Sequence, residues 1–225
     1  MTDFQRADGV TNSTAGVQPA RGGVIPASAL HFLTGQVEAA QQLVMQYHYS
    51  RRIPSNVRVV GSLHFDGGLF GGQGECVAAA FFSIPPTRWA EPVLELSRLV
   101  RRDGEQPPLT LLISLSLRAV RAAGGDLVVS FADRQQRHEG IVYRAANWHY
   151  AGIRANAMDG VMVNGTFHPG RSCNSIFGTR SPDKLRTLFP HKTIEPHYDA
   201  GKHLYWKALG PRGMAKAARL GLKQP

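Results

Sequence analysis

The sequence predicts an α/β (α+β) protein: a single domain with a central mixed β-sheet flanked by helices. Its 225 residues, 43% of them hydrophobic, suffice for one well-buried core. Between Glu95 and Gly152, apolar strand-like runs alternate with helical runs. Polar side chains cluster directly after each strand-like run, which is where ligands bind in open α/β sheets. We therefore expect the functional site at the strand ends between Arg98 and Tyr143.

The first part of the chain predicts a disordered segment, a long helix and a hairpin. Residues 1–25 are rich in small and polar residues and contain no apolar signal-peptide core. The folded domain spans residues 26–210. It begins with a helix from Ala27 to Tyr49, where apolar residues recur roughly on one face. Strands Val57–Phe65 and Glu75–Ile84 then flank a glycine-rich turn.

Strand Val93–Val100 carries the first candidate residue. Simple alternation places Arg98 on a face with aliphatic residues. A charge in such a place must be paired or must face a pocket. We expect Arg98 to hold an anionic group, and the alternative is a salt bridge with Glu95 or Asp126.

A basic, glycine-containing loop, Arg101–Pro108, precedes a helix from Leu109 to Ala123. A helix N-terminus of this kind is a common anion site. The hydroxyl of Ser114 either faces a ligand or bonds to a carbonyl one turn back. The candidate cofactor-binding residues of this segment are Arg101, Gly104 and Thr110.

The β-branched run from Asp126 to Ala132 predicts a buried central strand. It ends at Asp133, which either caps the next helix or takes part in the chemistry. Tyr143 lies in that next helix. Its hydroxyl either points at the ligand or belongs to the core.

The last third predicts a less regular structure. Its elements are a strand at Val161–Gly165, a loop at Phe167–Arg180, a helix at Ser181–Pro190 and a strand at Lys202–Gly210. Residues 211–225 form a basic tail that is expected to be mobile. A homodimer would follow if the final strand, with its alternating aromatic residues, lay at a sheet edge.

The charge predicts a polyanionic partner. Lysine and arginine number 26 against 16 acidic residues, giving a net charge of +10, which favours nucleic acid over a mere gain in solubility. Tyr47–Ser55 adds aromatic and basic residues suited to stacking and to phosphate contacts. Within it, Tyr49 is a candidate functional residue, and His48 is either functional or part of the core. The candidate DNA-binding residues are Arg51, Arg52, Arg171 and Arg180.

Other signals are negative. No apolar run approaches the length of a membrane span, and the two separated cysteines suit a reducing cytoplasm. Four histidines are available to a redox metal, but their spacing matches no recognisable metal site. These are His48, His64, His168 and His203.

Several motifs carry a resemblance to known families. The order strand, loop, helix, strand, helix, with Tyr143–Trp148 in the last helix, resembles the GNAT acyltransferase superfamily. Arg101–Gln106 is similar to its R/Q-x-x-G-x-G/A pyrophosphate loop, but Gln106 replaces the last small residue and two prolines follow. This departure argues against ordinary acyl-CoA binding.

A closer resemblance is to the Mom family of phage proteins, over residues 28–209. It rests on His48–Tyr49, on the blocks ELSRLV, ISLSLR, SFAD and YRAANW, and on the closing K-H-x-Y. The resemblance implies a GNAT-like fold and the conversion of adenine in DNA to N6-carbamoylmethyladenine, which protects phage DNA from host restriction. It implies action on double-stranded DNA in the host cell cytoplasm. The catalytic residues that it implies are Tyr49, Arg98, Ser114, Asp133 and Tyr143, with His48 beside them.

The donor of the two-carbon amide unit is unknown from the sequence. Simple acyl transfer would place a carbonyl on N6, whereas the product has a methylene there. Acetyl-CoA with a rearrangement, or an aminoacyl-type carrier, are the two options. The alternative functions are an ordinary GNAT acyltransferase acting on a protein, tRNA or small-molecule amine, and a DNA-binding protein without catalysis.

Overall fold

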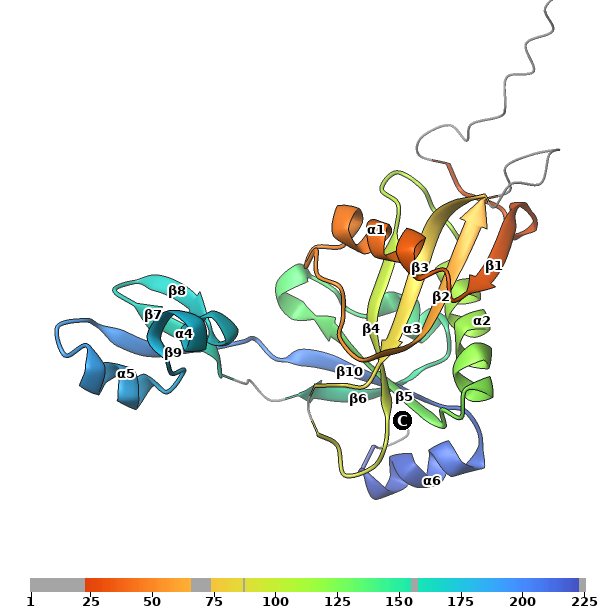
Figure 1. Cartoon of the computed structure of the whole chain (residues 1–225). Coiled ribbons are helices and arrows are strands. Elements are labelled where there is room, and N and C mark those ends of the chain that lie inside the picture. Colours follow the sequence, from red (N-terminus) through yellow and green to blue (C-terminus); the bar gives the residue numbers. More distant parts are fainter. Residues whose placement is uncertain (1–22, 66–73, 87, 155–157, 223–225) are drawn as a thin grey trace, which may run out of the picture.

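A seven-stranded mixed sheet forms the centre of the computed structural model (Figure 1). The structure describes residues 23–65, 74–86, 88–154 and 158–222. The strand order is β1-β2-β3-β4-β5-β10-β6, and β4 with β5 is its one parallel pair among the described residues. The strands are β1 (Leu30–Thr34), β2 (Val57–Phe65), β3 (Glu75–Ser83), β4 (Leu94–Arg101), β5 (Leu127–Asp133), β6 (His149–Arg154) and β10 (Lys202–Ala208).

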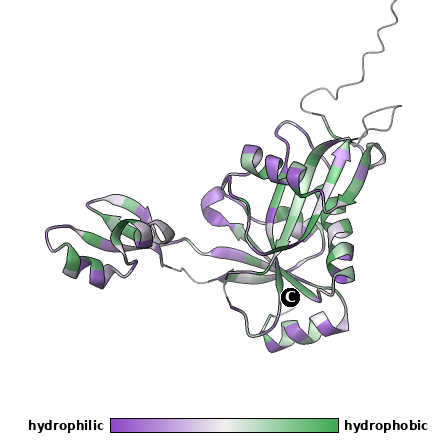
Figure 2. Ribbon diagram, viewed as in Figure 1, coloured by the Kyte–Doolittle hydropathy of each residue, from purple (hydrophilic) through white to green (hydrophobic). Residues whose placement is uncertain are grey.

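Helices cover both faces of this sheet. Helix α1 (Val37–Tyr47) packs on the face that carries Phe81, and α2 (Leu109–Ala122) packs on the opposite face, which carries Phe82. Helix α6 (Pro211–Arg219) covers the α1 side of β5 and β10. The short helix α3 (Ile141–Ala145) contacts α2. Hydrophobic residues therefore concentrate along the strands of the sheet (Figure 2).

The parallel pair β4–β5 separates soon after it forms. Only Leu94 with Val128 and Glu95 with Val129 are paired. Ser97 is an extra residue in β4, because Phe81 pairs with Arg98 whereas Phe82 pairs with Leu96. We call the diverging segments, Leu96–Arg101 and Ser130–Asp133, the β4–β5 fork.

A second, smaller unit lies between β6 and β10. It contains the sheet β8-β7-β9, made of β7 (Met158–Val163), β8 (Thr166–Pro169) and β9 (Ile194–Tyr198). Helices α4 (Gly170–Phe177) and α5 (Pro182–Leu188) accompany it. This insertion lobe, residues 158–200, has its own buried cluster and stands to one side of the large sheet (Figure 1).

The predicted fold class, a mixed α/β sheet flanked by helices, is confirmed. The single helix over Ala27–Tyr49 is wrong, because Leu30–Thr34 pairs with β2 as strand β1. Two further differences concern the C-terminal part. β10 lies between β5 and β6, so it offers no edge for the expected homodimer. Residues 211–219 form helix α6 where a mobile tail was expected.

Two observations complete the comparison. The prediction of disorder for residues 1–25 falls mostly outside the described residues, although Ile25 is buried in the main core. Among the helices that the structure describes, none is long and apolar enough to cross a membrane.

Candidate functional site at the β4–β5 fork

All of the predicted catalytic residues except Ser114 gather around the β4–β5 fork. Arg98 comes from β4, Asp133 ends β5, and His48 and Tyr49 follow α1. Electrostatic coupling links Arg98 with His48 and Tyr49, and links Asp133 with Tyr49. Tyr143 of α3 is coupled to Tyr49 as well. Residues far apart in the sequence therefore lie near one another around the fork.

The extra residue in β4 decides where Arg98 points. Because Phe81 pairs with Arg98 and lies under α1, the arginine also faces the α1 side of the sheet. Its Nη1 donates to the Ser97 carbonyl at 2.6 Å, and its Nε donates to the Arg52 carbonyl at 3.1 Å. The alternative partner Asp126 instead binds Lys216 at 3.0 Å.

Glu95 joins the site, which the sequence did not predict. It occupies the last paired position before the fork, on the same face as Arg98. Burial raises the pKa of Glu95, and the positive charges of Arg98 and Lys202 oppose that rise. A carboxyl group with a raised pKa is a common feature of sites that move protons.

Asp133 is held at the tip of β5 by the turn that follows it. Its Oδ1 accepts from the Gln135 N–H at 3.0 Å, and its Oδ2 lies 3.8 Å from Lys202 Nζ. Asp133 thereby caps the short 3-10 turn Arg134–Gln136, whereas the helix that carries Tyr143 begins after Gly140. The capping bond uses one oxygen, so the carboxylate retains acceptor capacity for a ligand.

Tyr143 is fixed by a hydroxyl chain across the fork. Ser130 Oγ lies 2.9 Å from both the Leu96 carbonyl and the Tyr143 hydroxyl. A carbonyl can only accept, so Ser130 donates its one proton to Leu96, and Tyr143 supplies the proton of the other bond. The chain therefore holds the phenol between the two separating strands.

The local sequence explains how Tyr143 reaches this place. Asn147 adopts a left-handed conformation (φ 57°) just after α3, which asparagine tolerates better than most residues. The chain then turns back, and Trp148 N–H donates to the Tyr143 carbonyl at 2.9 Å. The Tyr143 ring packs 5.3 Å from Trp148 and 5.2 Å from Tyr205. Burial raises the pKa of Tyr143 to about 12, so its phenol keeps its proton at neutral pH.

His48 and Tyr49 form an aromatic pair at the mouth of the site. Their rings are stacked with centroids 4.4 Å apart, and Tyr49 meets His138 edge-on at 5.9 Å. Ser50 N–H donates to His48 Nδ1 at 3.1 Å, so the neutral imidazole carries its proton on Nε2. Tyr49 is 53% exposed, which leaves a ring face for a ligand.

His48 gives a first prediction about stability. Burial, assisted by Arg98 and His138, lowers the pKa of His48 from 6.5 to about 4. The unfolded imidazole therefore binds a proton that the folded one excludes, and the free energy of unfolding falls as the pH drops through this window. Urea unfolding measured at several pH values should show a weaker pH dependence in His48→Asn. The exposed His191→Asn serves as control, and an unchanged dependence in His48→Asn would contradict the assignment.

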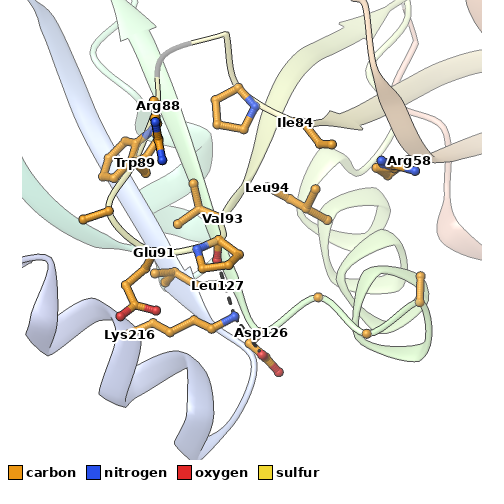
Figure 3. Close-up of a pocket in the computed structure, with 16 residues that line it drawn as sticks. Arg58, Ile84, Arg88, Trp89, Glu91, Val93, Leu94, Asp126, Leu127 and Lys216 are labelled. Carbon is orange, nitrogen blue, oxygen red and sulfur yellow. Dashed lines mark hydrogen bonds and ion pairs between the residues drawn. The ribbon is translucent and has the colours of Figure 1, made fainter.

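Ser114 does not lie at the fork. It is exposed on the outer face of α2 and lines a separate hollow of about 560 Å³ together with Thr110, Arg118, Arg121 and Lys207. The implied catalytic role of Ser114 therefore has no support from its position. Another hollow, of about 650 Å³, lies at the opposite ends of β4 and β5, beside the Asp126–Lys216 pair (Figure 3). It contains none of the predicted catalytic residues.

The loop Arg101–Gln106 does not fit the pyrophosphate of an acyl-CoA. Gln106 N–H donates to the Gly23 carbonyl at 3.2 Å, and Pro107 and Pro108 have no N–H to offer. Arg101 Nη1 donates to the Glu105 carbonyl at 2.8 Å. Gly104 serves the turn itself with a φ of 78°. Gln106 and the two prolines therefore offer no free N–H to a phosphate at the end of this loop.

The predicted DNA-binding arginines are divided between two places. Arg51 and Arg52 are exposed and follow Tyr49 after Ser50. Arg180 is exposed on the insertion lobe, between α4 and α5. The side chain of Arg171 lies outside the described residues. Among the part of the chain that the structure describes, no group of His, Cys, Asp or Glu is arranged to hold a metal ion.

A family model decides the classification. The model of the Mom protein family matches residues 30–220, which includes the whole fork and the insertion lobe. The chain belongs to the Mom protein family. The Mom likeness seen in the sequence motifs is thereby confirmed.

Two further comparisons were made. A candidate acetyltransferase of the GNAT family from Desulfovibrio desulfuricans has a solved structure with a TM-score of 0.41 and 10% sequence identity. The similarity covers 81% of this chain and 100% of that one. A search of curated proteins finds no match.

Proposed function

We propose that this Mom-family protein is a phage DNA-modification enzyme that converts adenine in DNA to N6-carbamoylmethyladenine. The modification would protect phage DNA from restriction in the host cytoplasm. The observation that carries the proposal is the meeting of Tyr49, Arg98, Asp133 and Tyr143 at the β4–β5 fork, in a chain of the Mom family.

The reaction requires the base to leave the duplex. The exocyclic nitrogen of paired adenine is inside the stack, so the enzyme must extrude the base into its site. Exposed Tyr49 supplies an aromatic face for it, and stacking of this kind contributes about 1–3 kcal/mol per base. Trp148, the other aromatic candidate, is only 5% exposed and packs against Tyr143 instead.

Proton transfer is the second requirement. The N6 lone pair is delocalised into the ring, so attack must be accompanied by loss of a proton from N6. In the transfer, the bond from N6 to the methylene carbon forms and the bond from that carbon to the leaving group breaks with its electron pair. Asp133 accepts the N6 proton, and the neutral Tyr143 phenol breaks its hydrogen bond to Ser130 and donates that proton to the leaving group. Arg98 orients a carbonyl or anionic part of the donor.

Positive charge brings the DNA to this place. Arg51 and Arg52, which follow Tyr49 after Ser50, contact phosphates beside the extruded base. Arg180 would contact the duplex from the insertion lobe. The donor is a small molecule or a carrier-bound unit, whose chemical identity we leave unassigned.

Expression of the intact chain with a plasmid tests the proposal. Total plasmid DNA is digested to nucleosides and analysed by mass spectrometry, with an empty-vector culture as control. We expect a new nucleoside with the mass of N6-carbamoylmethyldeoxyadenosine, and a matching loss of deoxyadenosine. Unmodified deoxyadenosine together with rapid acetylation of a peptide or an amine would instead favour an ordinary acyltransferase.

A further inference from the structure

A hollow next to the fork joins the core to the insertion lobe. It has a volume of about 240 Å³, and its lining includes Asp133 and Lys202 from the large sheet. Across it lie Phe167 and Asp159 from the lobe, with Asp199 from the segment that returns to β10. Small-molecule pockets typically measure about 300–1,000 Å³. The volume of this hollow is below that range, which suits a ligand no larger than one flat ring system.

The hollow and the candidate site have Asp133 in common. The same carboxylate lines the hollow and is coupled electrostatically to Tyr49 at the mouth of the fork. A neighbouring hollow, which includes Glu95, shares Lys202 and Asp199 with it. A ligand in the hollow would therefore place its polar edge beside the carboxylate proposed to take the N6 proton.

Phe167 is the aromatic residue that lines this hollow, and its ring is fixed by neighbouring residues of the lobe. Its ring lies over Gly160, where an added Cβ would stand 2.5 Å from a ring carbon. His197 packs against the ring with centroids 4.5 Å apart. His197 Nδ1 in turn lies 2.6 Å from Asp159 Oδ1. Phe167 nevertheless remains 41% exposed, which leaves part of its ring open to a ligand.

We propose that Phe167 of the insertion lobe stacks on the extruded adenine and makes the lobe the base-selecting part of the enzyme. This inference rests on the proposed function. The carboxylates of Asp133 and Asp199 face the ring edge, where they accept from an exocyclic amino group and repel the carbonyl oxygens of thymine and guanine. Tyr49 and Phe167 then contact the base from the core and from the lobe respectively.

Two substitutions at position 167 separate stacking from simple packing. Phe167→Tyr keeps the aromatic ring, whereas Phe167→Leu keeps an apolar side chain of similar reach without a π-face. We expect Phe167→Tyr to modify plasmid adenine nearly as well as the intact chain. Phe167→Leu should modify it about 5- to 150-fold less, which is the loss of about 1–3 kcal/mol of stacking. Equal modification by Phe167→Leu and the intact chain would overturn the inference.

Controls distinguish this inference from general damage and from failure of the proposed function. Leu188→Ala removes another exposed apolar side chain of the lobe, 57% exposed and outside the hollow, and should leave modification unchanged. Thermal unfolding checks that both Phe167 variants are folded. An intact chain that leaves plasmid adenine unmodified would count against the proposed function instead.

A second measurement needs no turnover. Saturation-transfer NMR uses free 2′-deoxyadenosine as the probe and thymidine as the comparison. The intact chain and Phe167→Tyr should transfer saturation to deoxyadenosine more strongly than to thymidine, and Phe167→Leu should lose this signal. Equal transfer in the intact chain and in Phe167→Leu would show that Phe167 does not contact the base.

Discussion

Asp133→Asn should reduce the fraction of modified adenine by at least about 100-fold, because a positioned proton acceptor contributes roughly 10²–10⁴-fold to a rate. Asparagine retains the Oδ1 that accepts from the Gln135 N–H and has nearly the same shape. It lacks the charge that takes a proton from N6. The variant should therefore fold as the intact chain does, which circular dichroism and thermal unfolding will show.

Asp183→Asn is the matched control for this change. Asp183 is a carboxylate of the insertion lobe whose side chain is 89% exposed and pairs with Arg186 at 2.7 Å. Its substitution should leave nucleoside yields unchanged. If Asp133→Asn keeps full activity while Glu95→Gln loses it, the proton acceptor is Glu95, the other carboxyl group at the fork, and the role given to Asp133 is wrong.

Tyr143→Phe should lower adenine modification by about 100-fold, since the phenol is the proton donor of the proposed reaction. The ring keeps its contacts with Trp148 and Tyr205, and Ser130 keeps its bond to the Leu96 carbonyl. The lost hydrogen bond should cost only about 0.5–1.5 kcal/mol of stability. Nucleoside yield and urea unfolding of the same preparation measure the two effects separately.

Tyr198→Phe controls for the loss of a hydroxyl group. Tyr198 lies on β9 of the insertion lobe and is 54% exposed, so its variant should match the intact chain in both measurements. Tyr143→Phe with normal modification would remove the phenol from the mechanism. Unfolding of Tyr143→Phe at a much lower urea concentration would assign the residue a structural role in the core.

The main strands and the strand-end positions of Arg98 and Asp133 could be predicted from the sequence, because alternation and strand ends are local signals. The run before Asp133 is apolar and β-branched, and this pattern predicts the buried strand that the structure has there, with Asp133 at its end. Tyr143 and Trp148 stand at a spacing that brings them together once Asn147 turns the chain. Only the family resemblance predicts that Tyr49 lies near these residues, since no local sequence pattern links the end of α1 to β5.

The extra residue in β4 explains one error. Regular alternation separates Glu95 from Arg98 on opposite faces, whereas the insertion of Ser97 brings both to the α1 side. A single sequence gives no signal for such a bulge. Glu95 was therefore considered only as an ion-pair partner of Arg98, although its position at the fork raises its pKa.

Two other errors have simpler physical causes. Leu30–Thr34 has apolar residues that suit both a helix and a strand, and pairing with β2 decided between them. Ser114 is two residues from Ser116, so the two point in different directions on α2. Since Ser116 is fully buried against the sheet, Ser114 faces outward.

The central claim is that an extruded adenine is modified at the β4–β5 fork. The most direct test is parallel nucleoside analysis of plasmid DNA from cells that express the intact chain, Asp133→Asn or Asp183→Asn. The account predicts N6-carbamoylmethyldeoxyadenosine with the intact chain and with Asp183→Asn, and almost none with Asp133→Asn. Equal amounts of the modified nucleoside from all three chains would contradict it, because the reaction would then take place without the carboxylate at the tip of β5.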